Sequence, residues 1–370
     1  MKKYETIIIG GGISGLACAR RLKERGKSFL LITKDIGGRI CSSTDGKTNY
    51  GASWLGSHYQ HVNRFVIKGR RIRGLGLYFG GKRLSLCSPI FRFPWQFIKT
   101  VWLTQKFFRT YKTFQKRSEH VSQKEAIESD PYLRTLYFQP AEQFVEEHGI
   151  QDFARLLIEP IMFGGTLTRL PEQTAFYFMF LCLLMIISGH EFVLDTEKLT
   201  ETFKGDIKID EVAMLSKNGD RYLLQTVEGH EYLARNVVVA TEPAVAQKLL
   251  GLMEIKKGTD AHIFHVRGAI KDKFRTGMMK LFGYDEPIFA IAEAADGTYV
   301  VHSLVSSLDL SLYFDKWEII ATKYWQPMFA TKGNILLDAK QGENLWMIGD
   351  HNVIGLEDSF ITGLYAAGQI

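Results

Sequence analysis

The sequence has few cysteines, and their spacing gives them no metal-binding or redox role. The four lie far apart, at Cys18, Cys41, Cys87 and Cys182. No two of them form the C-x-x-C pair that is typical of zinc ligands and redox dithiols. We therefore predict no metal site, and we expect reduced thiols in a cytoplasmic setting.

Long apolar runs are also lacking. After the two N-terminal lysines, the first apolar run covers only residues 7–9, whereas a signal peptide needs about 7–15 such residues. Residues 175–187 are almost wholly apolar, but they fall short of the roughly 20 residues that span a bilayer. We predict neither a signal peptide nor a transmembrane helix.

A strong charge of one sign is missing as well. The 370 residues include 46 basic and 40 acidic side chains, a net charge of +6, and 46% of them are hydrophobic. This composition is that of a folded protein and does not indicate nucleic-acid binding, although an anionic ligand or lipid surface suits it. The length suggests about two domains, and no internal repeat is present.

The first 33 residues carry the pattern of a β-α-β unit. An apolar strand is expected at 6–9, a helix follows the glycines and ends at Gly26, and residues 29–32 form a second buried strand. Strands are also expected at 207–212, 222–227, 236–240 and 344–350, with helices dominating from 78 to 192 and a last helix at 359–370. The order predicts an α/β fold with a doubly wound parallel sheet.

A glycine turn between that first strand and helix matches the G-x-G-x-x-G pattern. Gly10 permits the tight turn, Gly12 lets a pyrophosphate approach the backbone, and Gly15 lets the helix pack on the strand. The following residues, Ile13 and Ser14, open the helix, whose free N–H groups favour phosphate oxygens. We therefore predict a dinucleotide-binding turn.

The acidic residue that usually binds the adenosine ribose is missing. About 20 residues after the glycines the second strand ends in Thr33, with Lys34 and Asp35 behind it. A threonine hydroxyl bonds a ribose less strongly than a carboxylate does. We expect Thr33 to contact the ribose, with Asp35 as the next candidate, and Lys34 is a candidate partner for a phosphate.

Several segments resemble the FAD-dependent amine oxidase superfamily, which includes protoporphyrinogen oxidases and carotenoid desaturases. Gly37, Gly38 and Arg39 look like its Gly-Gly-Arg motif, and 49–54, with Gly51, Ala52 and Ser53, is similar to its D-x-G-A-x-W stretch beside the flavin. Residues 159–165 and 170–175 resemble the protoporphyrinogen-oxidase branch. Val212 lies in a strand like the one that holds the adenine, and Ala240 in a V-x-A-T-x-P signature.

The C-terminal segment continues the resemblance. Gly349 and Asp350 look like the Gly-Asp pair whose carboxylate binds the ribityl chain, and 356–363, which includes Ser359, resembles the helix start under the flavin ring. Asp358 departs from this pattern, because the family has glycine there. A carboxylate beside the flavin pyrimidine would disfavour the anionic reduced flavin.

The resemblance implies a Rossmann-type FAD-binding domain, at 1–78, 203–255 and 335–370, interleaved with an α+β substrate domain at 79–202 and 256–334. It implies an oxidoreductase in which the substrate passes a hydride to flavin N5, with reoxidation by oxygen or a quinone. The apolar composition of the substrate domain favours a hydrophobic substrate. Two alternatives are a non-catalytic flavin-binding relative that acts as a partner or scaffold, and an NAD(P)-dependent reductase.

The resemblance also gives one candidate catalytic residue. Counted back from Lys273-Phe274, the lysine that reaches a water near flavin N5 in amine oxidases corresponds to His265. A histidine is a suitable proton acceptor near neutral pH. The alternative is a half-buried strand histidine that is hydrogen-bonded to backbone.

Residues 91–117 have the composition of a membrane-interface helix. Phe97, Val101, Phe108 and Tyr111 fall on one face of a helical wheel, and Lys99, Lys106, Arg109 and Lys116 lie opposite or beside them, with Trp95 and Trp102 among the basic residues. Mixed aromatic and basic side chains suit an anionic lipid surface. The chain is thus expected at the cytoplasmic face of a membrane, or the helix simply covers the core.

Overall fold

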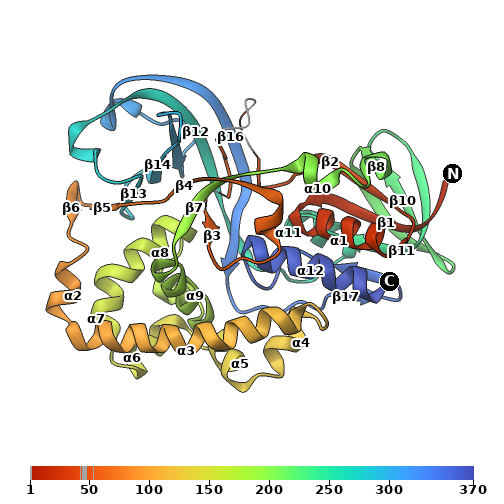
Figure 1. Ribbon diagram of the computed structural model, residues 1–370, viewed down its shortest axis with the longest axis horizontal. Coiled ribbons are helices and arrows are strands. Elements are labelled where there is room, and N and C mark those ends of the chain that lie inside the picture. Colours follow the sequence, from red (N-terminus) through yellow and green to blue (C-terminus); the bar gives the residue numbers. More distant parts are fainter. Residues whose placement is uncertain (1, 42, 44–47, 53) are drawn as a thin grey trace.

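The computed structural model describes residues 2–41, 43, 48–52 and 54–370. Ser53, which the sequence placed beside the cofactor, lies outside the described residues. Two large sheets stand at opposite ends of the structure, with a layer of helices beneath them (Figure 1).

The first sheet is a Rossmann-type parallel sheet. Its central order is β18-β11-β1-β2-β8, with all neighbours parallel. The antiparallel strands β17, β10 and β9 extend it. The strands are β1 (Lys2–Gly12), β2 (Phe29–Gly37), β8 (Ile207–Ile209), β9 (Val212–Asn218), β10 (Arg221–Thr226), β11 (Glu231–Val239), β17 (Lys340–Gly342) and β18 (Leu345–Met347).

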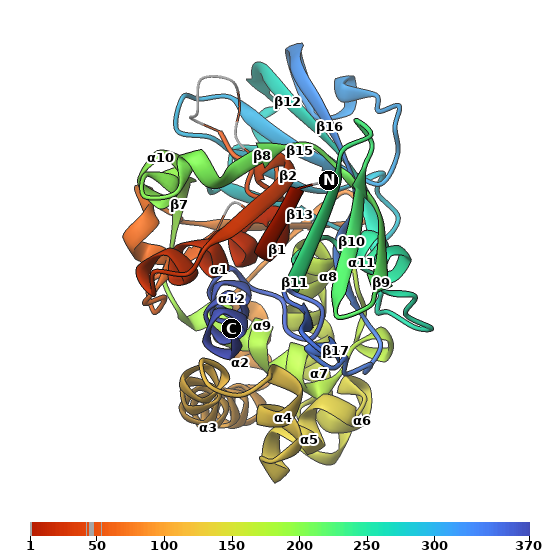
Figure 2. The ribbon, with the colours of Figure 1, turned by 90° about the vertical axis from the view of Figure 1, so that its right-hand side faces the viewer.

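Both faces of this sheet are covered, as its apolar strands require. Helices α1 (Ile13–Glu24) and α12 (Leu356–Gln369) pack together on one face (Figure 2), where a side chain on Gly363 would collide with the backbone of Ser14. Helix α10 (Thr196–Thr200) lies beside α1. Strands β9 and β10 and helix α11 (Pro243–Leu250) enclose the apolar core on the other face.

The second sheet is mainly antiparallel, in the order β16-β12-β15-β14-β13-β5-β6. Its strands are β5 (Leu75–Phe79), β6 (Lys82–Leu84), β12 (Lys257–Ile270), β13 (Met279–Phe282), β14 (Ile288–Glu293), β15 (Tyr299–Ser303) and β16 (Phe314–Lys332). A small third sheet joins β3 (Leu55–Gly56), β7 (Gly189–Leu194) and β4 (Val66–Arg71).

Helices α2 to α9 form an aromatic-rich layer beneath the two sheets, and α8 packs on β13 and β14 of the second sheet (Figures 1 and 2). Pro131 and Pro140 stand at the starts of α5 and α6, as their missing N–H groups allow. The helices are α2 (Ser88–Arg92), α3 (Pro94–Ser118), α4 (Gln123–Glu128), α5 (Pro131–Phe138), α6 (Ala141–Glu147), α7 (Gln151–Phe153), α8 (Glu159–Thr166) and α9 (Ala175–Ile186).

The predicted α/β fold is confirmed, and three local predictions need correction. Strand β2 runs five residues beyond residue 32, to Gly37. The strand expected at 207–212 is interrupted between β8 and β9. Strands β5 and β6 stand at 75–84, where helices were expected, because β5 pairs with β13 far along the chain. The proposed domain boundary at residue 78 falls inside β5.

Candidate cofactor site

The glycine turn lies at the carboxyl end of β1 and leads directly into α1. Gly10 has φ +107°, and a Cβ there would stand 2.5 Å from the carbonyl oxygen of Ala240. A Cβ on Gly15 would stand 2.0 Å from the oxygen of Gly10. These two positions therefore require glycine. The turn also brings Ala240, from the end of β11, against the start of α1.

The start of α1 is open to a ligand. Gly12 is its N-cap, no side chain caps the helix, and the first turn has no acidic residue. A Cβ on Gly12 would meet no atom within 4 Å among the described residues. The N–H groups at Ile13 and Ser14 thus begin a helix whose positive dipole end is available to an anion.

The Gly-Gly-Arg segment packs directly on this turn. Strands β1 and β2 continue their pairing as far as Gly12 and Gly37. A Cβ on Gly38, whose φ is +59°, would stand 3.0 Å from the Cα of Gly12. The extension of β2 beyond Thr33 therefore holds this motif against the phosphate-binding turn.

Thr33 is engaged with the backbone. Its Oγ1 accepts a hydrogen bond from the N–H of Gly11 at 2.8 Å and donates one to the carbonyl oxygen of Asp35 at 2.6 Å. The residue is buried. Its hydroxyl thus fixes the turn, and a bond to a ribose would have to replace one of these contacts. The Asp35 side chain is exposed at the end of β2.

An exposed ion pair links β2 to the residue before β9. The Nζ of Lys34 lies 2.8 Å from Glu211 Oε2 at an exposed position, so its partner here is a carboxylate. Val212 follows, buried at the start of β9. In the preceding turn, the N–H of Asp210 donates to the carbonyl oxygen of Thr33.

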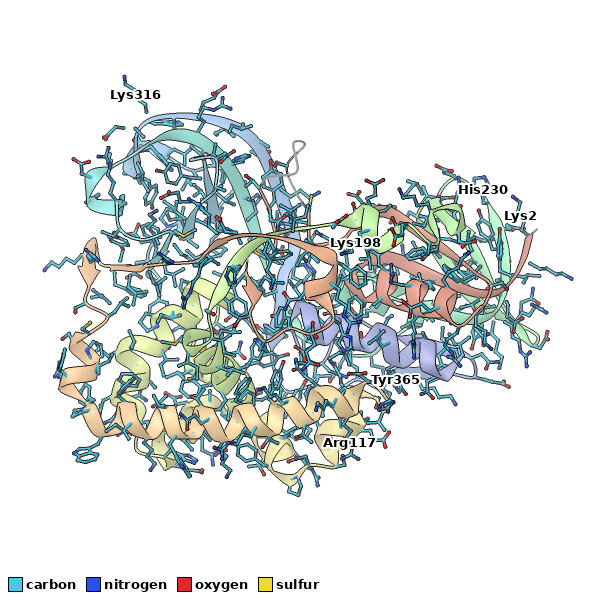
Figure 3. The ribbon with its side chains drawn as sticks, in the orientation of Figure 1. Lys2, Arg117, Lys198, His230, Lys316 and Tyr365 are labelled. Atoms are coloured by element: carbon cyan, nitrogen blue, oxygen red, sulfur yellow. The ribbon has the colours of Figure 1, made fainter. Side chains whose placement is uncertain are left out.

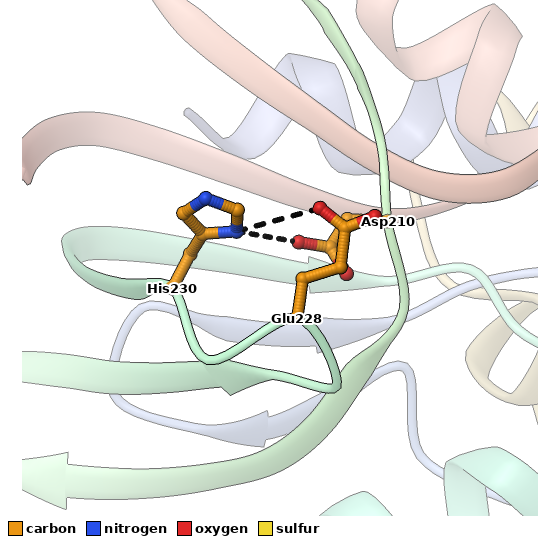
Figure 4. Close-up of side chains that lie close together, drawn as sticks. All are labelled: Asp210, Glu228 and His230. Atoms are coloured by element: carbon orange, nitrogen blue, oxygen red, sulfur yellow. Dashed lines mark hydrogen bonds and ion pairs between the residues drawn. The ribbon is translucent and has the colours of Figure 1, made fainter.

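Asp210, Glu228 and His230 come close together behind this turn (Figure 4). His230 Nδ1 lies 3.0 Å from Asp210 Oδ2 and 3.7 Å from Glu228 Oε2. Asp210 also accepts a bond from the N–H of Glu211. The cluster ties the β8–β9 turn to the β10–β11 hairpin, and its hydrogen bonds account for the buried carboxylate without a metal ion.

Arg39 and Asp350 join two of the predicted motifs. The Nη2 of Arg39 lies 2.5 Å from Asp350 Oδ1. Burial opposes the charge of Asp350, but the Arg39 guanidinium and the neighbouring His351 together keep the pKa of Asp350 below its usual range. Gly51 lies against Arg39, whose carbonyl oxygen accepts a hydrogen bond from the N–H of Ala52. At the other end, a Cβ on Gly349 would stand 3.8 Å from Ser14 Oγ.

The start of α12 carries two buried acidic residues. The carboxylate of Glu357 accepts hydrogen bonds from the N–H groups of Gln60, His61 and Val62. Asp358 is directed at α3, where its oxygens accept bonds from Tyr111 Oη at 2.6 Å and Gln115 Nε2 at 3.2 Å.

Burial raises the pKa of Asp358 to about 7, although the two α3 donors lower it. The sequence predicted this carboxylate beside the flavin pyrimidine. In the structure it contacts α3 of the helical layer instead. Ser359, the next residue, is buried, and its carbonyl oxygen accepts a bond from Thr362 Oγ1.

Sequence reasoning missed a buried lysine behind the Gly349-Asp350 turn. Lys256 is 3% exposed and donates to Tyr177 Oη at 2.9 Å and to the carbonyl oxygen of Asn352. Tyr137 and Tyr177 donate to the same carbonyl. Burial lowers the pKa of Lys256 to about 7, against the opposing charge of Asp350. No local pattern marks Lys256, because its partners come from α5, α9 and the β18–α12 loop.

His265 lies on β12, between β15 and β16 of the second sheet, and is 4% exposed. Its Nδ1 lies 3.0 Å from Tyr50 Oη, and its Nε2 lies 2.7 Å from Thr298 Oγ1. The partners are side chains, so the expected alternative of a histidine bonded to backbone does not describe these contacts.

The comparisons with known proteins agree with this architecture. A family model described as NAD(P)-binding Rossmann-like domain matches residues 8–68. No curated protein matches the sequence. A putrescine oxidase bound to putrescine superposes with a TM-score of 0.70 at 12% identity, over 99% of this chain and 98% of that one.

Two further structures superpose over almost their whole length. A protein assigned as a protoporphyrinogen oxidase, from Exiguobacterium sp. 255-15, has a TM-score of 0.65 at 14% identity and covers 100% and 98% of the two chains. A CLA-producing fatty acid isomerase from P. acnes has a TM-score of 0.71 at 12% identity and covers 99% and 98%. The chain shares the fold of these three structures.

The residues of the cradle fit a dinucleotide of this fold. A dinucleotide-binding turn must admit a pyrophosphate, and here the turn is open at Gly12 and closed to side chains at Gly10 and Gly15. The uncapped start of α1 supplies donors for the phosphates.

Proposed function

We propose that the protein is an FAD-dependent oxidoreductase. The observation that carries this is the open glycine turn at the start of α1, with the Gly-Gly-Arg segment packed on it and the Arg39–Asp350 pair beside it. Together these contacts bring the residues of three separated motifs to one edge of the Rossmann sheet. An oxidoreductase with an NAD(P) cofactor is less favoured, because Gly349 and Asp350 meet the same cradle.

The cofactor would be held by the turn and by the polar groups around it. Residues 10–15 and Gly38 would hold the pyrophosphate, Asp350 the ribityl chain, and the start of α12 the flavin ring. When bound, FAD supplies a hydride acceptor at N5. The chain itself would exclude water and orient the substrate.

The substrate would be hydrophobic. The helical layer presents a large apolar core that includes α3, α5 and α9, and α9 is a buried helix with nine of its residues inside that core. Such surroundings favour a porphyrinogen, polyene or other lipid over a small polar amine. Reoxidation by oxygen or a quinone would complete the cycle.

A substrate panel tests this function. FAD-loaded protein is mixed without oxygen with protoporphyrinogen, a polyunsaturated fatty acid, a carotenoid precursor and putrescine, and flavin absorbance is followed. The proposal expects bleaching by a hydrophobic member and none by putrescine. A protein that binds FAD and is bleached by none of them would favour the non-catalytic alternative.

The protein would also dock on anionic membranes through α2 and α3. None of the described helices is long and apolar enough to cross a bilayer. Four apolar side chains are nevertheless exposed on this helical face: Phe91 by 82%, Trp95 by 80%, Ile98 by 54% and Trp102 by 59%. In α3 the spacing of Trp95, Ile98 and Trp102, three and four residues apart, puts them in one stripe.

Charge supports the same surface. Residues 46–118 carry 15 basic and no acidic side chains, whereas the rest of the chain has 31 basic and 40 acidic ones. Lys99, Lys106, Arg109 and Lys116 are exposed along α3, which ends near Arg117 at the rim of the helical layer (Figure 3). Exposed tryptophans among basic residues suit the lipid headgroup region.

A further inference from the structure

We propose that Tyr50, His265, Thr298 and Asp296 form a directed proton relay from the substrate side of the cofactor site to solvent. The three links measure 3.0 Å from Tyr50 Oη to His265 Nδ1, 2.7 Å from His265 Nε2 to Thr298 Oγ1, and 2.6 Å from Thr298 Oγ1 to Asp296 Oδ1. The proposal rests on the proposed oxidoreductase function, since it supplies the proton acceptor that such a reaction needs.

The direction of the relay follows from the hydrogen bond between Thr298 and Asp296. Thr298 has one hydroxyl hydrogen and donates it to Asp296, so its oxygen must accept from His265 Nε2. In the neutral imidazole, Nδ1 is then the acceptor, and Tyr50 donates to it. All three hydrogen bonds therefore point from Tyr50 toward Asp296.

The two ends of the chain lie in different environments. Tyr50 is partly buried, one residue before Gly51, which packs on Arg39. Trp325 Nε1 donates to its carbonyl oxygen at 2.9 Å and fixes this segment on β16. His265 and Thr298 are buried. Asp296 is exposed in the turn between β14 and β15.

The groups around Asp296, where the relay meets solvent, favour the ionised form of its carboxylate. Partial burial opposes the charge of Asp296, but the side-chain and backbone donors of Thr298 keep its pKa below the usual range. Arg70 also interacts electrostatically with Asp296. A carboxylate with a low pKa returns a proton to water readily.

The step is balanced without any redox change in the relay. The substrate X–H bond breaks as its proton joins Tyr50 Oη, and the Tyr50 proton passes to His265 Nδ1. The Nε2 proton passes to Thr298, and the Thr298 proton passes to Asp296, which releases it to water. Each atom in the chain gains one proton and gives up one. The electron pair of the X–H bond forms a double bond to the neighbouring substrate carbon, and the C–H bond of that carbon supplies the hydride that FAD, when bound, would accept.

The hydrogen bonding of His265 is tested without any substrate, by nitrogen NMR of FAD-loaded protein labelled at histidine. The His265→Asn variant assigns the signal. The relay predicts the neutral Nε2–H tautomer at pH 7.5. Thr298→Val should shift the Nε2 signal, whereas Thr298→Ser should preserve it. An Nδ1–H tautomer, or a Thr298→Val spectrum identical to wild type, would overturn the proposal even if FAD is bound.

The role of the relay in catalysis is tested with the panel compound that reduces the flavin. The quantity measured is the rate of flavin bleaching. Tyr50→Phe and His265→Asn should slow bleaching by about 100-fold, the usual contribution of a proton acceptor. Asp296→Asn should slow it by roughly tenfold, and Thr298→Ser should retain most of the rate that Thr298→Val loses.

Two controls separate the relay from folding and binding. Tyr324 donates to Asp260 at an exposed site on β16, so Tyr324→Phe should leave the rate unchanged. The relay variants should bind FAD and substrate as wild type does, and lose only the bleaching rate. Equal rates in wild type and Tyr50→Phe would refute the relay, while a protein that binds no FAD would refute the proposed function instead.

Discussion

Arg39 and Asp350 form a close ion pair, with 2.5 Å between Nη2 and Oδ1, at the edge where the Rossmann sheet meets the glycine turn. The two residues belong to motifs at opposite ends of the sequence. Arg39 also donates to the carbonyl oxygen of Met328 on β16, so the pair links the cofactor cradle to the second sheet. A ligand in the cradle would contact both sheets through this pair.

The first prediction concerns the open turn. Gly12→Val should abolish FAD binding, because its side chain would occupy the place of the pyrophosphate. The fold should survive, since a Cβ on Gly12 meets no described atom within 4 Å. Gly165→Val is the matched control, because that glycine is also open and lies on α8. FAD titration measures the affinity of both variants. If Gly12→Val binds FAD with unchanged affinity, the cofactor does not lie on this turn.

The second prediction separates Thr33 from Asp35. Thr33→Val should lower the free energy of unfolding by about 1–3 kcal/mol, because it leaves the N–H of Gly11 without its acceptor. Asp35→Asn should leave stability unchanged and weaken FAD binding by about tenfold, if its exposed carboxylate binds the ribose. Denaturant unfolding and FAD titration measure these effects. Should Thr33→Glu tighten FAD binding instead, Thr33 itself is the ribose partner.

The third prediction is a pH dependence of stability. Asp358 has a pKa of about 7 in the folded protein, against about 4 when unfolded. Between pH 4 and 7 the folded state therefore binds more protons than the unfolded state, so this group makes stability fall as pH rises, up to about pH 7.

Asp358→Asn removes this titration. Relative to wild type, the variant should gain about 1–3 kcal/mol in unfolding free energy between pH 5 and pH 8. Denaturant unfolding at the two pH values measures the difference, in which other titrating groups cancel. An equal effect of the substitution at both pH values would show that Asp358 is ionised throughout.

The fourth prediction concerns membrane docking. Binding to anionic vesicles should fall as salt rises, since each basic residue near the surface contributes about 1 kcal/mol that screening removes. Lys99→Glu with Lys106→Glu should weaken binding, and Trp95→Ala with Trp102→Ala should weaken it further at high salt. Lys257→Glu, on the exposed start of β12, is the charge-reversal control for each single substitution. If the protein does not sediment with vesicles at low salt, α3 has a purely structural role.

Local patterns predicted the first β-α-β unit because its strand, turn and helix are neighbours in the chain. Gly10, Gly12 and Gly15 have roles that depend on a few residues on either side. The same holds for the breaks at Pro131 and Pro140, where the ring restricts the backbone of its own segment.

Features that depend on long-range pairing were not accessible in this way. Strands β5 and β6 are short and become strands because β13 offers them a partner. The partners of Lys256 come from three separated elements. Thr33 was expected at the ribose because only its position in the strand was known, and its bond to Gly11 follows from the register of β1 and β2.

The most direct measurement is the absorbance spectrum and mass of the small molecule released when the purified protein is denatured. The proposed function predicts FAD, held without a covalent bond and in roughly equal amount to the protein, with the Gly12→Val protein colourless. A wild-type protein that carries no flavin and takes up none from added FAD would contradict it.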